Sequence, residues 1–265
     1  MSTLITTSWD DGHPTDLRIA EMLARHGLTG TFYIPRAIET GVMSLPAMRE
    51  IAQKFEIGAH TLNHVFLSDT DDTTAKNEIS GSKAWVEDIT GHPCVMFCPP
   101  AGRFLPQHLP IFRDAGFLGI RTVEFMSFDR PRIDTKGLLE MPTTMQAFPQ
   151  PALNYAKNLA KRRAIKSFWR YAIHGRSRDW VQLAKNLARR AIAEDGVFHI
   201  WGHSWEVEQT KQWGRLDEVL GFLGQLKREQ KTPCKTNGEI CLEAAASSVK
   251  AEVGSSRATT RAAVL

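Results

Sequence analysis

Short runs of apolar and β-branched residues alternate along this chain with longer segments whose apolar residues recur at helical spacing. The strand candidates are Leu4–Ser8, Gly30–Ile34, Glu56–His60, Val95–Cys98, Gly119–Thr122, Leu138–Thr143 and Val197–Gly202. The helical segments are Pro14–His26, Ser44–Lys54, Thr73–Thr90, Pro106–Ala115 and Gln212–Arg228. This alternation favours an α/β fold with a parallel sheet or barrel over a sandwich of two sheets.

The length of the chain and its hydrophobic content are those of a globular protein with a sizeable core. It has 265 residues, of which 42% are hydrophobic, and its body contains no internal repeat or evident linker. We therefore expect one domain over residues 1–243, including a helical insertion near 152–194. Residues 244–265 are mostly small and polar, which predicts a disordered tail.

Charge, cysteine content and hydropathy exclude several classes of protein. The formal net charge of +4 is too small to indicate a nucleic-acid-binding protein by itself. The four cysteines, Cys94, Cys98, Cys234 and Cys241, form no closely spaced pair, which favours reduced thiols. The sequence shows no secretory signal and no apolar run near the roughly 20 residues of a membrane-spanning helix. We expect a cytoplasmic protein.

Two acidic residues end the first strand candidate, in the segment Asp10-Asp11-Gly12. Side chains alternate along a strand, so one carboxylate can bind a ligand while its neighbour, reoriented by the turn at Gly12, stays free. A nearby divalent cation would offset the repulsion between the two carboxylates. Taken alone, the tripeptide is equally typical of a solvent-exposed turn.

Two histidines, His60 and His64, follow another strand candidate. Their spacing of four would place both imidazoles on one face of a helical turn. In α/β folds the carboxyl ends of parallel strands carry the functional site, so these imidazoles are expected near Asp10 and Asp11. One carboxylate and two imidazoles can hold a divalent cation with open coordination positions, and zinc, cobalt, nickel, manganese and ferrous iron all suit this set. A second carboxylate could then act as a base.

A third histidine, His203, follows the apolar run that ends at Gly202. It could protonate a leaving group, or it could be a core histidine bonded to a backbone carbonyl. His199 lies inside the strand candidate and is expected to be structural. Trp201 and Trp205 flank His203 and could wall a pocket or belong to the core.

These segments resemble the NodB-homology polysaccharide deacetylases, carbohydrate esterase family 4. The resemblance rests on Thr7–Gly12, on His60–His64 and on Gly30–Ile34 between them, and it covers roughly residues 4–125 and 195–225. It implies a distorted (β/α) barrel with about seven parallel strands. It also implies a metal-dependent hydrolase that removes an N-acetyl or O-acetyl group from a sugar, in the biosynthesis of a surface polysaccharide or lipopolysaccharide.

The resemblance also implies roles for individual residues. Asp10 would be the general base and His203 the general acid, while Asp11, His60 and His64 would hold the metal, most simply zinc. The backbone N–H of Ala101 would bind the oxyanion.

The third motif of the family departs from the expected pattern at Cys98, where members carry an arginine that orients the base. Arg103 and Arg121 are the candidates to replace that arginine, and we also expect them to contact the substrate, together with Trp201 and Trp205. The Asp-Trp element of the family has its only candidate at 179–180.

A basic segment, 157–190, contains Asp179 as its single acidic residue. Such a run is commonly a solvated helix face. Alternatively it faces an anion, which would suit nucleotide-linked or lipid-linked sugars or a membrane surface.

Three other functions remain open from the sequence. The chain could hydrolyse small amides that are not sugars, or it could be a metal-free carbohydrate-binding pseudoenzyme, for which the absent arginine is the best argument. A nucleic-acid-binding module would rest on the basic segment alone. The sequence does not indicate an oligomeric state.

Overall fold

The computed structural model describes residues 3–134, 137–149 and 179–247. In these residues the strands are β1 (Leu4–Asp10), β2 (Thr31–Ile34), β3 (Glu56–Ala59), β4 (Met96–Phe97), β5 (Gly119–Arg121), β6 (Arg132–Ile133), β7 (Leu139–Met141), β8 (Met145–Gln146) and β9 (Val197–His203). The helices are α1 (Asp16–Arg25), α2 (Leu45–Ala52), α3 (Asp72–Thr90), α4 (Leu109–Asp114), α7 (Trp180–Ala193), α8 (Ser204–Gln209) and α9 (Trp213–Glu229). Three short 3-10 turns lie at Leu67–Asp69, Pro100–Gly102 and Pro106–His108.

The strands form one curved sheet in the order β6-β7-β5-β4-β3-β2-β1-β9-β8. Every neighbouring pair is parallel except β6–β7, so the predicted α/β class is confirmed. The sequence predicted about seven strands and missed β6 and β8. Each has two residues, too few for a readable alternation, and neither lies in an apolar run such as Val95–Cys98, which contains the equally short β4. The sheet is an open half-barrel in the described residues, since β6 and β8 form its two edges.

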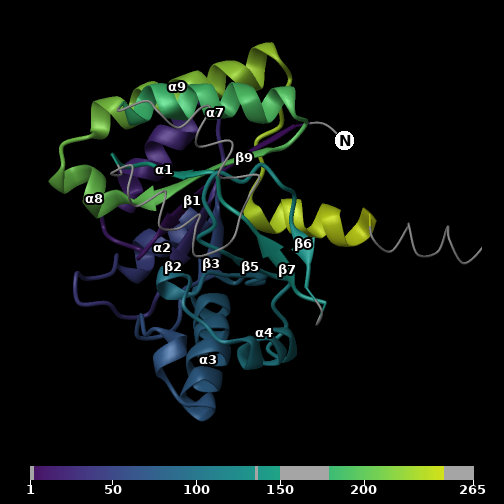
Figure 1. Cartoon of the computed structure of the whole chain (residues 1–265). Coiled ribbons are helices and arrows are strands. Elements are labelled where there is room, and N and C mark those ends of the chain that lie inside the picture. The colour runs from purple at the N-terminus through teal and green to yellow at the C-terminus, as the bar shows by residue number, and fades with distance from the viewer. Residues whose placement is uncertain (1–2, 135–136, 150–178, 248–265) are drawn as a thin grey trace, which may run out of the picture.

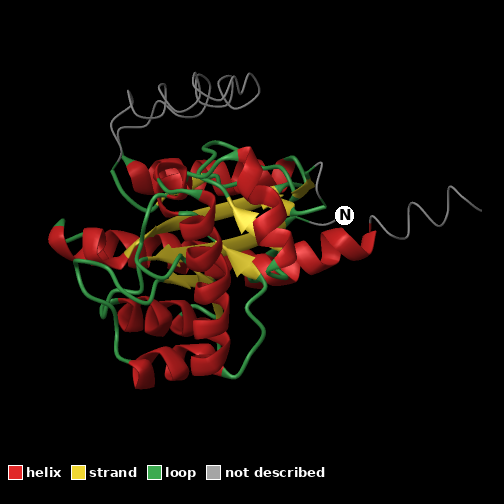
Figure 2. Ribbon diagram, turned by 90° about the horizontal axis from the view of Figure 1, so that it is seen from below, coloured by secondary structure: helices red, strands yellow, loops and turns green. Residues whose placement is uncertain are grey.

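Helices cover the outer side of this half-barrel. In Figure 1, α7 and α9 lie on one side of β1 and β9, while α3 and α4 lie at the opposite end, beyond β3. Figure 2 shows strands in the interior of the molecule with helices around them. The larger hydrophobic core fills the space between sheet and helices, with Trp9, Phe32 and Phe97 among its fully buried residues. β1 is buried along its whole length, which places its carboxyl end well inside the molecule.

The inner side of the half-barrel has its own smaller core and a polar network. A helix over residues 237–247 packs against this core through Ile240 and Cys241. Asn237 at its start donates to the Tyr33 hydroxyl (2.9 Å) and bonds to the Thr6 hydroxyl (2.9 Å). The described chain is therefore helical as far as residue 247, four residues into the segment expected to be a tail. Residues 248–265 lie outside the described residues.

Most of the helical insertion near 152–194 also lies outside the described residues. Its carboxyl-terminal part forms α7, where Lys185 pairs with Glu218 of α9 (2.7 Å) and Arg190 pairs with Glu194 (2.7 Å). Arg190 is about half exposed, as a solvated helix face would require, whereas Lys185 is mostly covered where α7 packs against α9. In the described part of the chain, no helix has the length and apolar content needed to cross a membrane.

Candidate active site

The acidic pair lies where β1 turns away from the sheet. Asp10 is the last residue of the strand and is in register with Tyr33 of β2 and His203 of β9. Asp11 has a left-handed backbone (φ 79°), as does Gly12 (φ 62°), whose added Cβ would lie 2.5 Å from Ile34. This turn directs the two carboxylates differently, as the alternation argument predicted.

The two histidines converge on Asp11. The Nε2 atom of His64 lies 3.1 Å from Asp11 Oδ1, and that of His60 lies 3.4 Å from the same oxygen. The predicted proximity is confirmed, but the predicted helical turn is wrong. Residues 60–64 form an irregular loop in which Thr61 (φ 65°) and His64 (φ 51°) have left-handed backbones. The loop, rather than helical spacing, brings the imidazoles together.

The contacts of these three side chains fit a divalent cation. His60 Nδ1 bonds to the Cys98 carbonyl (2.6 Å), so its Nε2 carries the lone pair that faces Asp11. Asp11 Oδ1 is buried and has no hydrogen-bond partner among the described residues. Burial opposes ionisation of Asp11, but the facing His60 and His64 outweigh it and hold its pKa well below the usual range. An ionised carboxylate with two imidazole nitrogens is a donor set typical of zinc and similar metals.

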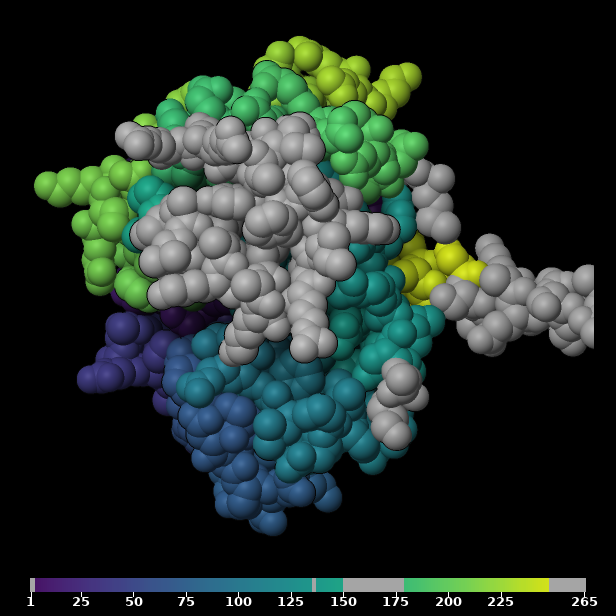
Figure 3. Space-filling model, viewed as in Figure 1, coloured from purple at the N-terminus to yellow at the C-terminus, as the bar shows by residue number. Residues whose placement is uncertain are grey.

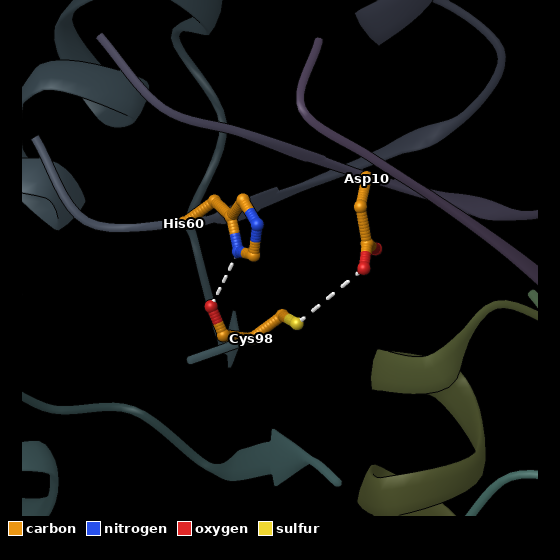
Figure 4. A group of neighbouring side chains, drawn as sticks. All are labelled: Asp10, His60 and Cys98. Carbon is orange, nitrogen blue, oxygen red and sulfur yellow. Dashed lines mark hydrogen bonds between the residues drawn. The ribbon is translucent and has the colours of Figure 1, made fainter. Parts of the chain in front are cut away.

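A second group of possible donors, Asp10, His60 and Cys98, lies beside the first (Figure 4). Burial raises the pKa of the Cys98 thiol well above its ordinary value, and its Sγ lies 3.9 Å from Asp10 Oδ2. Asp10 Oδ2 already pairs with Arg121. The geometry therefore favours Asp11, His60 and His64 as the ligand set.

Arg121, at the end of β5, holds Asp10 from inside the half-barrel. Its side chain is fully buried, and Nη2 donates to Asp10 Oδ2. The guanidinium lies 4.6 Å from the Trp201 ring centroid and 5.5 Å from that of Tyr33, so two aromatic faces help to stabilise the buried cation. Burial opposes its charge, but the neighbouring Asp10 carboxylate outweighs this and raises the pKa of Arg121. Of the two candidates to replace the absent arginine, Arg121 reaches Asp10.

Arg103 lies on the surface instead. Half of its side chain is exposed, it stacks 4.7 Å over the Phe66 ring, and it pairs with Asp69 at 3.3 Å. It follows the Pro100–Gly102 turn, in which Ala101 has a left-handed backbone (φ 52°) at the carboxyl end of β4. Ala101 thus lies on the same edge of the sheet as the metal-binding candidates, while the side chain of Arg103 points away to its own surface partners.

His203 ends β9 and faces Asp11, with Nε2 3.9 Å from Oδ2. Its Nδ1 bonds to Glu206 on α8 (2.7 Å), and Glu206 also accepts from Gln146 on β8 (2.7 Å). Burial alone would lower the pKa of His203, but the Glu206 hydrogen bond and the charges of Asp10 and Asp11 raise it to about 9. The imidazole is therefore cationic at neutral pH, the form that a general acid needs.

The two tryptophans beside His203 differ in their surroundings. Trp201 is buried, stacks against Phe125 at 6.3 Å and lies over Arg121. Trp205 is half-buried, and its indole N–H donates to Asp11 Oδ2 (2.8 Å). Trp201 thus walls the guanidinium of Arg121, and Trp205 orients a candidate metal ligand.

Two further sequence-based expectations concern His199 and Asp179. His199 is buried and bonded to Ser8 Oγ (2.9 Å) and to the Pro142 carbonyl (2.9 Å), and burial lowers its pKa to about 3, as expected of a neutral structural histidine. Asp179 caps α7 through the Val181 N–H and pairs with Arg215. These contacts place the Asp-Trp candidate at the start of α7 rather than beside His203.

Sequence reasoning missed the residues that hold the acid and the ligand loop. The contact of Glu206 with His203 could have been predicted, since Glu206 follows His203 by three residues at the start of a helix. The contact of Gln146 could not have been predicted, because no apolar run in the sequence marks β8 as a strand. The carboxylate of Glu78, on α3, was also overlooked, although it bonds to the loop between His60 and His64.

Comparisons with known proteins agree with this geometry. A family model described as polysaccharide deacetylase matches residues 2–120. A peptidoglycan-N-acetylglucosamine deacetylase of Bacillus cereus is 28% identical over 133 residues, which are 49% of this chain and 59% of that relative. The match therefore spans less than two thirds of the relative.

Solved structures with related names share the fold. A Mycobacterium smegmatis protein provisionally called a polysaccharide deacetylase superposes with a TM-score of 0.68 at 16% identity, covering 93% of this chain and 91% of that chain. A carbohydrate esterase family 4 pseudoenzyme from Bacillus anthracis has a TM-score of 0.56 at 15% identity, covering 91% and 66%. The chain is therefore similar to the polysaccharide deacetylase family over residues 2–120, which contain Asp10, Asp11, His60 and His64, and it shares the half-barrel fold of the solved structures.

Proposed function

We propose that this protein is a metal-dependent hydrolase that removes an acetyl group from a sugar. One observation carries the proposal. Asp11, His60 and His64 converge within 3.4 Å, while Asp10 on one side and a cationic His203 on the other remain outside the ligand set. A base and an acid that flank a candidate metal site are the groups that hydrolysis of an amide or ester requires.

Asp11, His60 and His64 would hold the cation, which as a Lewis acid polarises an acetyl carbonyl and lowers the pKa of water. Asp10, held by Arg121, would accept the proton of the attacking water through its other oxygen. The N–H of Ala101 would donate to the developing oxyanion. His203, kept cationic by Glu206, would protonate the departing amine or alkoxide.

The sugar substrate is supported by the family and by the name of the Bacillus cereus relative, which acts on N-acetylglucosamine in peptidoglycan. The site suits an acetyl group on either nitrogen or oxygen, because both leaving groups need the same proton. We retain the proposal that the substrate is a nucleotide-linked or lipid-linked sugar in the cytoplasm. That proposal rests on the basic segment 157–190, most of which lies outside the described residues.

The test is hydrolysis by the purified chain, stripped of metal and reloaded in turn with Zn²⁺, Co²⁺, Ni²⁺, Mn²⁺ and Fe²⁺. The substrates are N-acetylglucosamine oligomers, an O-acetylated xylan, a UDP-linked N-acetyl sugar and a small cyclic amide. Acetate release from a sugar that depends on metal, and that Asp10→Asn lowers by about 10²–10⁴-fold, is the expected result. Turnover of the cyclic amide alone would replace the proposal with a non-sugar amidase.

A pseudoenzyme is the second candidate, because Cys98 occupies the position of the family arginine and a structural relative is a pseudoenzyme. The contact of Arg121 with Asp10 argues against it, since the base keeps a buried cationic partner. A wild-type chain that binds sugar oligomers but releases no acetate with any of the metals would establish the pseudoenzyme.

A further inference from the structure

The loop that presents His60 and His64 has a backbone that needs outside support. Thr61 and His64 both have left-handed backbones (φ 65° and 51°), a conformation unfavourable for residues other than glycine. Residues 60–64 are neither helix nor strand, so neither element's hydrogen bonds hold this backbone in place. A strained, irregular loop keeps its shape only where surrounding structure fixes it.

Helix α3 supplies that support through one buried carboxylate. Glu78 Oε2 accepts the backbone N–H groups of Leu62 (2.7 Å) and Asn63 (2.9 Å), and Oε1 accepts the Asn63 side-chain amide (2.6 Å). Glu78 is 6% exposed, so these three bonds are shielded from water. The two backbone donors lie between the two histidines, at the centre of the loop.

A glycine one turn further along the same helix completes the contact. A Cβ added to Gly81 would lie 2.7 Å from Leu62 Cδ1, so the absence of a side chain at 81 lets Leu62 pack closely against α3. The Leu62 carbonyl accepts from the Ala37 N–H on the opposite side (2.8 Å). Leu62 is thus held by its N–H, its side chain and its carbonyl.

We propose that Glu78 is a positioning residue for the metal site: its carboxylate, with the space at Gly81, fixes the loop so that His60 and His64 face Asp11. The inference rests on the metal site of the proposed function but not on the substrate. Since partners outside the ligand set typically change metal affinity by about 10–100-fold, the effect should be measurable in binding alone.

The experiment measures metal affinity without substrate, by competition of Zn²⁺ or Co²⁺ between the metal-free protein and a chelating dye. Glu78→Ala should raise the Kd about 10–100-fold, and Glu78→Gln, which keeps one acceptor oxygen, should restore part of the affinity. Glu87→Ala is the matched control, because Glu87 is also on α3 and accepts a backbone N–H, that of Cys94 (3.0 Å), away from the ligand loop. It should lower thermal stability and leave the Kd unchanged.

Gly81→Ala provides a second test that does not weaken the helix, because alanine favours helix more than glycine does. The added methyl should displace Leu62 and raise the metal Kd in a fully folded protein, even if Glu78→Ala fails to fold. If Glu78→Ala folds and its metal affinity is unchanged, the inference about Glu78 is overturned. If Glu78→Ala does not fold, unchanged affinity in Gly81→Ala overturns it instead. Either result leaves the proposed function intact. A wild-type chain without metal affinity would overturn the metal site and with it the proposed function.

Discussion

The two parts of the chain contribute to the candidate site in different ways. Residues 2–120, which the family model matches, supply the candidate base and all three candidate metal ligands. Residues from 121 onward supply the candidate acid, His203, and three further supporting groups: Arg121 binds Asp10, Trp205 binds Asp11, and Glu206 binds His203. In Figure 3 the blue segments lie in the lower part of this face, and green segments lie at its top. The candidate base and metal ligands therefore lie in the part that the family model matches, whereas these three supporting contacts come from residues outside it.

The largest expected effects test the matched part. Asp11→Asn should remove both metal binding and activity, because it deletes the anionic ligand that both histidines face. Asp10→Asn should keep the metal and lower kcat by about 10²–10⁴-fold, the usual contribution of a general base. Metal content by mass spectrometry and turnover measured on the same samples separate the two. Equal metal loss in both variants would show that Asp10 is a ligand.

The next test concerns the contact between Asp10, in the part that the family model matches, and Arg121, just beyond it. Arg121→Ala should lower kcat by about 10²-fold, since Asp10 loses the partner that orients it, and should destabilise the fold by about 3–5 kcal/mol because a buried carboxylate is left unpaired. Turnover is measured at a temperature where the variant is folded. Arg103→Ala, on the surface, is the control and should retain turnover.

The double variant Cys98→Arg/Arg121→Ala sharpens the same comparison. Cys98 Sγ lies 3.9 Å from the same Asp10 oxygen that Arg121 binds, so an arginine at 98 could reach it once the space at 121 is empty. We expect partial recovery of turnover relative to Arg121→Ala, and none from Cys98→Arg alone, which would crowd two cations together. Failure of the double variant to exceed Arg121→Ala would show that the site depends on the strand from which the arginine comes.

A pH profile tests the acid. The pKa of His203 is raised to about 9, so the cationic form that donates a proton is lost as pH rises through that value. A bound divalent cation would lower this pKa by compensating Asp11, so the alkaline limb of kcat/KM should fall at or below about 9. Glu206→Gln removes the hydrogen-bonding anion and should move the limb to lower pH. Glu208→Gln, on the same helix but bonded to Trp213, should leave the limb in place.

The smallest effect concerns His199, the histidine expected to be structural. Ser8→Ala removes its partner at Nε2 and should lower the free energy of unfolding by about 1–2 kcal/mol, because a buried imidazole nitrogen loses its hydrogen bond. Activity and metal content should not change. Denaturant unfolding gives the stability, and a loss of turnover greater than the loss of folded protein would assign this pair to the site.

The sequence predicted that the acidic pair and the two histidines lie close together, because they follow strands and parallel strands bring their carboxyl ends together. The choice of Asp11 as the metal-binding carboxylate came from the family resemblance. It named Arg121 without choosing it, because the partner of a buried arginine depends on which strands are neighbours and on their register. It was wrong about the turn between His60 and His64, since spacing alone cannot distinguish a helix from a strained loop. It gave Glu78 no role, because a carboxylate on an amphipathic helix has the same pattern whether it faces solvent or a loop.

The pairing of β1 with β9 constrains how the protein can be made. Ser8 and His199 bond across this pair although 191 residues separate them. During synthesis on the ribosome, the second edge of β1, the strand that carries Asp10, therefore stays uncovered until β9 (Val197–His203) has been made. Until then that edge is open to pairing with other chains, so slow translation or interruption before β9 should favour aggregation, a hazard that chaperones would have to limit.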